Sequence, residues 1–306
     1  MSDTASAPAP AAQNDAMRGF LFALSSYVFW GFLPLYMKAV VHIPALEIVA
    51  HRIVWSVPVA AVVLFMLGRT ADIKRALRSP RTLAMAALTA AVISCNWGTY
   101  VYAIATNRTV ETALGYYINP LVNVALGALF LGERLKGYQF VAVGLATLAV
   151  VILTVNAGGL PWISLVLALS FASYGFLRKT LPIGPSQGFF LEVLLLTPPA
   201  LAYIFWTVAS GDSHFLASQP MDIFLLMALG PATAIPLILF AFGAKLLRYS
   251  TIGIMQYTAP TLIFLIAVFV FREPFDTVKA FAFALIWVAL AIYSGPLLKD
   301  LIAAKK

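Results

Sequence analysis

The chain has 306 residues, of which 62% are hydrophobic and only 10% are charged, and its mean hydropathy is +0.92. An ordinary soluble domain is about one-quarter charged, so this composition excludes a soluble protein and predicts an integral membrane protein. The formal net charge of +8 would favour a nucleic-acid partner in a soluble chain, but in a membrane protein Lys and Arg first report orientation, and no nucleic-acid partner is expected.

The sequence predicts no enzyme and no bound cofactor or metal. Its one cysteine, Cys95, lies in an apolar run without metal-ligand spacing, which favours a buried small hydrophobic residue. The three histidines, His42, His51 and His214, show no paired metal-ligand spacing, and no glycine-rich phosphate loop follows a strand. We therefore expect neither a catalytic site nor an ATP-driven pump.

In chain order, residues 1–17 are rich in Ala, Pro and Ser without hydrophobic periodicity, which predicts a disordered tail. The next apolar run is too long for a signal-peptide core and lacks a cleavage site, so it is predicted to be an uncleaved first span. Charged residues, Pro and Gly separate further apolar runs of about twenty residues. Together these runs predict ten helices, over residues 19–37, 45–67, 83–105, 110–131, 138–155, 160–177, 187–208, 222–244, 250–271 and 278–298. Residues 300–306 form a predicted basic tail.

One sequence pattern occurs twice. The stretches Tyr117–Glu133 and Tyr257–Glu273 carry Tyr, Pro and Glu at the same spacing. Such a match indicates a duplicated unit, here residues 18–155 and 156–299. Because each unit contains five helices, the second enters the membrane in the opposite orientation. The predicted fold class is therefore an all-α integral membrane protein with ten transmembrane helices in two inverted five-helix repeats.

Lysine and arginine are distributed unequally between the two sides of this topology. With the N-terminus inside, the outer segments hold only Lys38, Arg108, Arg272 and Lys279, and the other basic residues outside the spans fall on inner segments. By the positive-inside rule, both termini are predicted to lie in the cytoplasm. The same rule and attraction to anionic lipid explain the basic connection 69–81 better than a nucleic-acid or regulatory role does.

Helix-breaking prolines lie at corresponding places in the two units. Pro120 matches Pro260, and Pro58 matches Pro199 when the units are shifted by one further residue. Paired interruptions in inverted repeats indicate a midplane substrate site or gate, because the freed carbonyls need protein or a wet cavity. Kinks that only improve helix packing are the alternative.

Four ionisable residues within the predicted spans are candidates for charge recognition or ion coupling: Glu47, His51, Arg52 and Glu192. An unpartnered charge at the bilayer centre costs about 2.5–3.5 kcal/mol on insertion scales. Glu47 and His51 share one helix face, and Glu192 matches His51, so a carboxylate and a basic cluster could face each other. This would be a proton-coupling or substrate-charge site, with His51 titrating near neutrality, or a fixed Glu–Arg pair that clamps the two units.

Polar and aromatic residues gather in the third, fourth and ninth predicted helices. They are Asn96, Trp97, Tyr100, Tyr116, Tyr117, Asn119, Asn123, Gln256 and Tyr257. Aromatic walls with a few placed polar groups are typical of small-molecule pockets, which predicts a substrate cavity. An interfacial aromatic belt is the alternative, but it does not explain Asn96 or Asn123. Glu111 follows Thr109, a good N-cap, and is interpreted as a first-turn carboxylate favoured by the helix dipole. Glu133 and Glu273 end helices and are interpreted as hairpin anchors.

Several of these residues together carry a resemblance to a known family. They are Glu47 with His51-Arg52, Asn96-Trp97, the block 114–123 (LGYYINPLVN) followed by 131–134 (LGER), Glu192, and Gln256-Tyr257 with Pro260-Thr261. This combination resembles the RarD branch of the EamA family in the drug/metabolite transporter superfamily, over about residues 17–298. Arg272 stands where family members commonly carry glycine, which counts against a tight turn there.

The resemblance implies two inverted five-helix repeats around a central cavity, which is built mainly by the third, fourth, eighth and ninth helices. It also implies alternating-access movement of a small organic solute, usually outward. We therefore expect a secondary-active transporter of a metabolite, an amino-acid-like compound or a drug, in a bacterial inner membrane. Membrane lipid and a small-molecule substrate are the expected partners, with protons as a candidate coupling ion. A passive channel, or a lipid or amphiphile translocase without ion coupling, is the alternative.

Overall fold

The computed structural model describes residues 10–131, 136–157, 159–217, 220–247 and 255–303, and within them the chain is helical with short connections and no strand. The helices are α1 (Pro10–Ala39), α2 (Ala45–Met66), α3 (Thr70–Leu77), α4 (Pro80–Ala105), α5 (Thr109–Leu131), α6 (Gly137–Ala157), α7 (Trp162–Thr180), α8 (Pro185–Ser210), α9 (His214–Ala217), α10 (Pro220–Leu246), α12 (Thr258–Leu265), the π-helix η1 (Ile266–Val270) and α13 (Thr277–Ala303).

Length and composition suit most of these helices to a bilayer. Among the described residues, seven stretches of 20 to 26 residues are long and apolar enough to cross a membrane, within α1, α2, α4, α6, α8, α10 and α13. Two shorter apolar stretches, Trp162–Arg178 and Thr258–Val270, accompany them. Large apolar side chains such as Phe65, Leu129 and Phe269 are exposed on the outer surface. A water-soluble protein would not expose so many, whereas lipid accommodates them.

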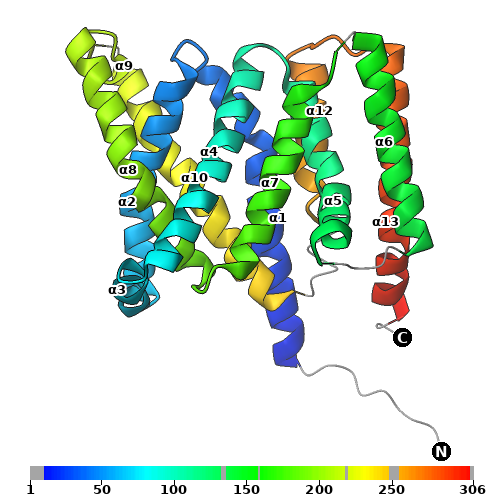
Figure 1. The fold of residues 1–306 in the computed structure, drawn as a ribbon, viewed down its shortest axis with the longest axis horizontal. Helices are drawn as coiled ribbons and strands as arrows, with labels where there is room; N and C mark the ends of the chain where they lie inside the picture. The colour runs from blue at the N-terminus through cyan, green and yellow to red at the C-terminus, as the bar shows by residue number, and fades with distance from the viewer. Residues whose placement is uncertain (1–9, 132–135, 158, 218–219, 248–254, 304–306) are drawn as a thin grey trace, which may run out of the picture.

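The long helices form one bundle, in which the described chain begins and ends at the same end (Figure 1). The first residues of α1 and the last residues of α13 lie at the lower end of the view. α6 and α13 pack on each other at one edge of the bundle, and α2, α8 and α10 lie towards the opposite edge. The core between them is built of Ile, Leu, Ala and aromatic side chains from all the long helices.

The helix contacts follow a pairwise pattern. α1 packs on α10 and α12, while α7 packs on α4 and α5. α2 packs on α8 and α10, and α8 packs on α2 and α4. α5 contacts α12, and α6 contacts α13. Exchanging α1 with α7, α2 with α8, α4 with α10, α5 with α12 and α6 with α13 maps this set of contacts onto itself.

The described helices differ from the predicted ones in four places, one of which is the C-terminal end, where α13 continues to Ala303 into the predicted basic tail. α1 begins at Pro10, so residues 10–17 of the expected disordered tail are helical; Ala, Gln and Met in this stretch are good helix formers. Two short helices, α3 and α9, lie in connections between the predicted spans, where the sequence predicts no helix. The span expected over 250–271 is described from Met255 onwards, and its last turn is the π-helix η1.

Among the described residues, two other than glycine adopt positive φ angles, and both end a span on the same side. Asn107, after α4, has φ 56°, and Arg272, after η1, has φ 55°. The missing glycine at position 272 counted against a tight turn, yet Arg272 itself takes the left-handed conformation that glycine would adopt freely. The chain therefore makes this turn with Arg272, and the next residue, Glu273, enters the interior at 7% exposure.

Candidate substrate site

A buried arginine, Arg52, joins three helices. It lies on α2, about 10 Å along the helix from Ala45 at 1.5 Å per residue, and its side chain is 5% exposed. Its Nε donates a hydrogen bond to Thr233 Oγ1 on α10 at 2.7 Å. Its guanidinium lies over the ring of Trp97 on α4, 4.5 Å from the ring centroid. One side chain of α2 thus contacts both α4 and α10 well inside the bundle.

The charge of Arg52 is only partly compensated. No carboxylate of the described chain lies within ion-pair distance of it, and its buried Nη1 has no hydrogen-bond partner. A cation–π contact with Trp97 stabilises it by about 0.5–2 kcal/mol. An unpaired charge inside a membrane is costly and is normally retained for a purpose. Arg52 is therefore a candidate binding residue.

Two tyrosines adjoin the arginine. Tyr100 on α4 is 3% exposed, and its buried hydroxyl has no hydrogen-bond partner. Its ring lies 6.2 Å from the ring of Tyr116 on α5, and both tyrosines are close enough to Arg52 to interact with its charge. Tyr116 donates its hydroxyl proton to Asn96 Oδ1 at 3.2 Å. Unused donors of Arg52 and Tyr100 therefore lie among aromatic rings. We call Arg52, Trp97, Tyr100, Tyr116 and Thr233 the arginine cluster.

Two of the three predicted asparagines, Asn96 and Asn119, attach α4 and α5 to α7, and the third, Asn123, supports Asn119 from within α5. Asn96 Nδ2 donates to Leu167 O at 3.1 Å and to Ser170 Oγ at 2.9 Å. Asn119 Nδ2 donates to Ala168 O at 3.1 Å, and Asn123 Nδ2 donates to Asn119 Oδ1 at 3.1 Å. Asn96 alone reaches the arginine cluster, through Tyr116.

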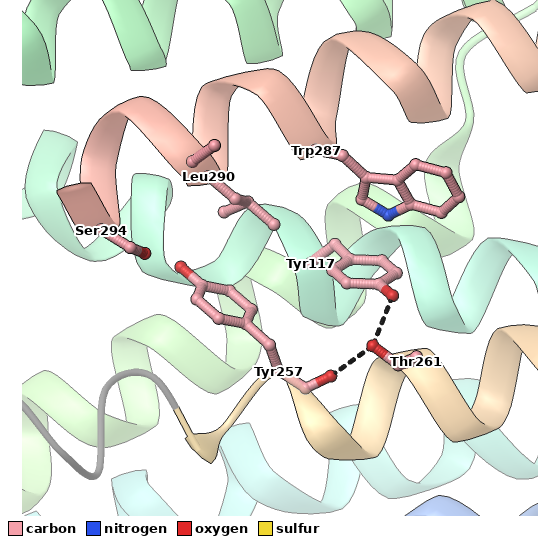
Figure 2. Close-up of a pocket in the computed structure, with 7 residues that line it drawn as sticks. Tyr117, Tyr257, Thr261, Trp287, Leu290 and Ser294 are labelled. Atoms are coloured by element: carbon pink, nitrogen blue, oxygen red, sulfur yellow. Dashed lines mark hydrogen bonds between the residues drawn. The ribbon is translucent and has the colours of Figure 1, made fainter. Parts of the chain in front are cut away.

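Tyr117 and Tyr257 line a different site, an open groove between α5, α12 and α13 (Figure 2). The groove has a volume of about 380 Å³. Tyr117 and Thr261 share a hydrogen bond of 2.7 Å, and Thr261 donates another to the backbone oxygen of Tyr257 at 2.7 Å. Trp287 and Ser294 complete it from α13. It shares no lining residue with the arginine cluster, and Gln256, beside Tyr257, is not among the residues that line it.

The two acidic candidates are engaged elsewhere. Glu47 is fully buried and accepts a hydrogen bond from the backbone N–H of His214 at 2.9 Å, while its other oxygen lies 2.8 Å from His214 Nδ1. Glu192 on α8 accepts from Arg178 Nη1 at 3.1 Å and from Tyr174 Oη at 3.0 Å, both on α7. Each carboxylate therefore has its own partner, and the structure does not bring either into an ion pair with Arg52.

His51 occupies a third location. Its Nδ1 accepts a hydrogen bond from Trp55 Nε1 at 3.2 Å, and its ring packs 4.9 Å from that of Phe215. Its buried Nε2 has no hydrogen-bond partner. The adjacent residues His51 and Arg52 thus face different neighbours.

The paired prolines are placed alike in the two halves of the chain. Pro120 in α5 and Pro260 in α12 are buried, whereas Pro58 in α2 and Pro199 in α8 are exposed on the apolar surface. The buried pair lies on two helices that contact each other. The exposed pair lies on α2 and α8, the two helices that carry Arg52 and Glu192.

Glu273 provides an anchor between distant parts of the chain. Its two carboxylate oxygens accept the backbone N–H groups of Thr109 and Val110 at 2.7 and 2.8 Å. It thereby caps the start of α5, where a negative charge is favoured by the helix dipole. Glu111, in the same turn, pairs with Arg108 at 2.6 Å. Glu133 lies outside the described residues.

Comparison with known proteins identifies the family. Residues 17–155 match the model of the EamA-like transporter family. The protein RarD of Streptomyces exfoliatus is 43% identical over 288 residues, which cover 94% of this chain and 91% of that protein. The protein RarD of Escherichia coli is 40% identical and covers 90% of this chain and 93% of its own length. The chloramphenicol-sensitive protein RarD of Pseudomonas aeruginosa is 32% identical over 90% of this chain and 93% of its own.

The chain belongs to the RarD branch of the EamA-like transporter family. As a RarD-family protein it is a multi-pass membrane protein of a transporter family and not an enzyme. A solved structure that shares 20% sequence identity superposes with a TM-score of 0.58 over 90% of this chain and 96% of that one. This similarity shows that the fold is shared.

Sequence reasoning missed several residues that complete the polar sites of this RarD-family chain. Thr233, the hydrogen-bond acceptor for Arg52, is an ordinary threonine in an apolar span. Arg178 and Tyr174, the partners of Glu192, lie near the end of α7. From the sequence, a basic residue at the end of a span indicates only the orientation of the chain in the membrane. The only sequence signal that could have identified any of these residues is a polar side chain in the middle of an apolar span, and among them Thr233 has that position.

Proposed function

We propose that this RarD-family chain is a secondary-active carrier, which moves a small organic solute across the bacterial inner membrane by alternating access. The arginine cluster is its central site. The observation that carries this proposal is the bridge made by Arg52, because the residue connects α2 and α4 of the first half with α10 of the second. Carrier sites lie at the interface between two halves near the midplane.

The pairwise contact pattern supports two inverted five-helix repeats, 18–155 and 156–299. In the exchange that maps the helix contacts onto themselves, each helix of the first half takes the place of the corresponding helix of the second half. An odd number of crossings per half reverses the second half, and the described chain does begin and end on one side of the bundle. With the basic residues at that end, both termini lie in the cytoplasm by the positive-inside rule.

Closure around the site supports a carrier more than a channel. Arg52 and Tyr100 are almost fully buried, and neither the groove of Figure 2 nor the groove lined by Cys95 and Ser170 includes them. A carrier passes through a state that is closed to both sides, whereas an open pore needs a continuous wet path. We infer that solute reaches Arg52 when α2, α4 and α10 separate on one side at a time, and that net movement is outward.

Solute counterflow in proteoliposomes tests the carrier. Vesicles are preloaded with unlabelled L-phenylalanine, 3-phenylpropionate or chloramphenicol, and entry of the same labelled compound is followed. We expect saturable labelled uptake for at least one compound, only in preloaded vesicles, and strong loss of it in Trp97→Ala. Trp206→Ala, which changes an exposed tryptophan of α8, is the matched control and should retain uptake.

Other outcomes identify the alternatives. Ion conductance without saturable counterflow would indicate a passive channel. Transfer of a fluorescent phospholipid between leaflets without counterflow would indicate a lipid or amphiphile translocase, for which the apolar groove of Figure 2 is the available surface.

A further inference from the structure

We propose that Arg52 binds the carboxylate of the carried solute, so that the substrate class is a small monocarboxylate with an apolar or aromatic body. This inference rests on the proposed carrier function and adds the chemistry of its substrate. It starts from a mismatch within the arginine cluster, where hydrogen-bond donors and a positive charge exceed the acceptors and negative charges that the protein supplies.

The groups that face Arg52 are neutral. They are Trp97 and Tyr100 from α4, Tyr116 from α5 and Thr233 from α10. The two carboxylates predicted within the spans are occupied elsewhere, since Glu47 binds His214 and Glu192 binds Arg178 and Tyr174. In the described chain, no protein anion therefore neutralises Arg52.

The unused donors define where an anion would bind. Nε of Arg52 is committed to Thr233, which leaves buried Nη1 free, and the buried hydroxyl of Tyr100 is also free. A carboxylate can accept hydrogen bonds from both kinds of donor, and arginine–carboxylate pairs are among the stronger polar contacts in proteins. The bound anion would neutralise the arginine and satisfy both donors together.

Arg52 is the one cation named at this site, so it matches a ligand with a single negative charge. Arg178 is paired with Glu192, and Arg108 is paired with Glu111 near the end of the bundle. A phosphate dianion would need a second cation beside Arg52, and the groups named as facing it supply none. The rings of Trp97, Tyr100 and Tyr116 instead offer an apolar, aromatic surface for the rest of the solute.

A purely structural arginine would behave differently. Contacts with Trp97 and Thr233 could brace the three helices without any ligand. In that case an uncharged residue of similar length would lose both contacts and destabilise the protein. If Arg52 is instead an uncompensated charge kept for binding, its replacement removes a burial cost, and the empty protein loses little stability.

Matched acid and amide probes test the proposal on the purified full-length protein. The probes are 3-phenylpropionate with 3-phenylpropionamide, and L-phenylalanine with L-phenylalaninamide, and the readout is the concentration-dependent rise in Tm. We expect at least one acid to bind the wild type about tenfold or more tightly than its amide. Arg52→Gln should abolish this preference, and Arg52→Lys should retain part of it. Arg108→Gln is the matched control and should behave as wild type.

Equal responses to acids and amides, no response to either acid, or an acid preference that survives Arg52→Gln would overturn the proposal. So would a large fall in the Tm of empty Arg52→Gln or its failure to fold, since both indicate a brace. Counterflow separates this inference from the carrier itself. Counterflow of neutral chloramphenicol alone, unchanged in Arg52→Gln, would refute the carboxylate site and leave the carrier. Acid-selective binding without any counterflow would support the carboxylate site and refute the carrier.

Discussion

At the scale of single residues, the arginine cluster combines groups that the sequence could select but not connect. Arg52, Trp97 and Tyr100 were predictable as candidates, because ionisable and polar groups are rare within apolar spans. Their contacts were not predictable, because Thr233 lies 181 residues from Arg52 and only helix packing brings them together. The same reason explains why Glu192 seemed suited to face His51, although its partners are on α7.

Thr233→Val tests the bond that ties Arg52 to α10. Valine keeps the shape of threonine but removes the acceptor, so a buried Arg52 Nε–H loses its partner, at a cost of about 1–3 kcal/mol of folding free energy. We expect a lower Tm in detergent. Thr147→Val is the control, since its hydroxyl binds within its own helix at an exposed position. Equal Tm values for the two variants would contradict this role of Thr233.

At the scale of helices, the prediction succeeded where hydrophobic runs were long and failed where local structure was short. The apolar runs fix most spans, because a bilayer demands about twenty apolar residues. α3, α9 and η1 escaped prediction, because four to eight residues carry too little periodicity to be recognised. Glu273 was expected to be an anchor, but the helix that it caps, α5, belongs to the other half of the chain.

The cap made by Glu273 can be measured. Glu273→Ala leaves the N–H groups of Thr109 and Val110 without their carboxylate, and capping contacts of this kind contribute about 0.5–2 kcal/mol. We expect a clear fall in Tm. Glu111→Ala, which removes a partly exposed ion pair with Arg108, should cost less, about 0–1 kcal/mol. If the two variants lose the same stability, the cap does not act as described.

The close approach of α10 to α2 depends on Gly230. A Cβ at this position would lie 2.1 Å from the backbone oxygen of Trp55, so even alanine forces the two helices apart beside the bond from Arg52 to Thr233. We expect Gly230→Ala to fold poorly or to lose several degrees of Tm. Gly144→Ala, with open space around it, should be neutral or gain about 0.5–1 kcal/mol. A well-folded Gly230→Ala with unchanged Tm would contradict this packing.

At the scale of the whole molecule, the duplicated Tyr-Pro-Glu pattern predicts two repeats, and the pairwise helix contacts are the observation on which the proposed two-repeat organisation rests. Sequence could not predict which helices of one half contact helices of the other, because the separation of the two copies along the chain carries no information about their distance in space. Nor could it predict that the aromatic candidates divide between the arginine cluster and the groove of Figure 2.

The central claim is that the arginine cluster lies between two inverted halves and opens to each side in turn. A Tyr100→Cys variant in a Cys95→Ser background, treated with a membrane-impermeant maleimide in right-side-out and inside-out vesicles, tests it most directly. Arg75→Cys and Asn107→Cys serve as controls for the inner and outer sides. We predict that position 100 reacts in both orientations while each control reacts in one. Reaction of position 100 from a single side only, or from neither, would contradict the account.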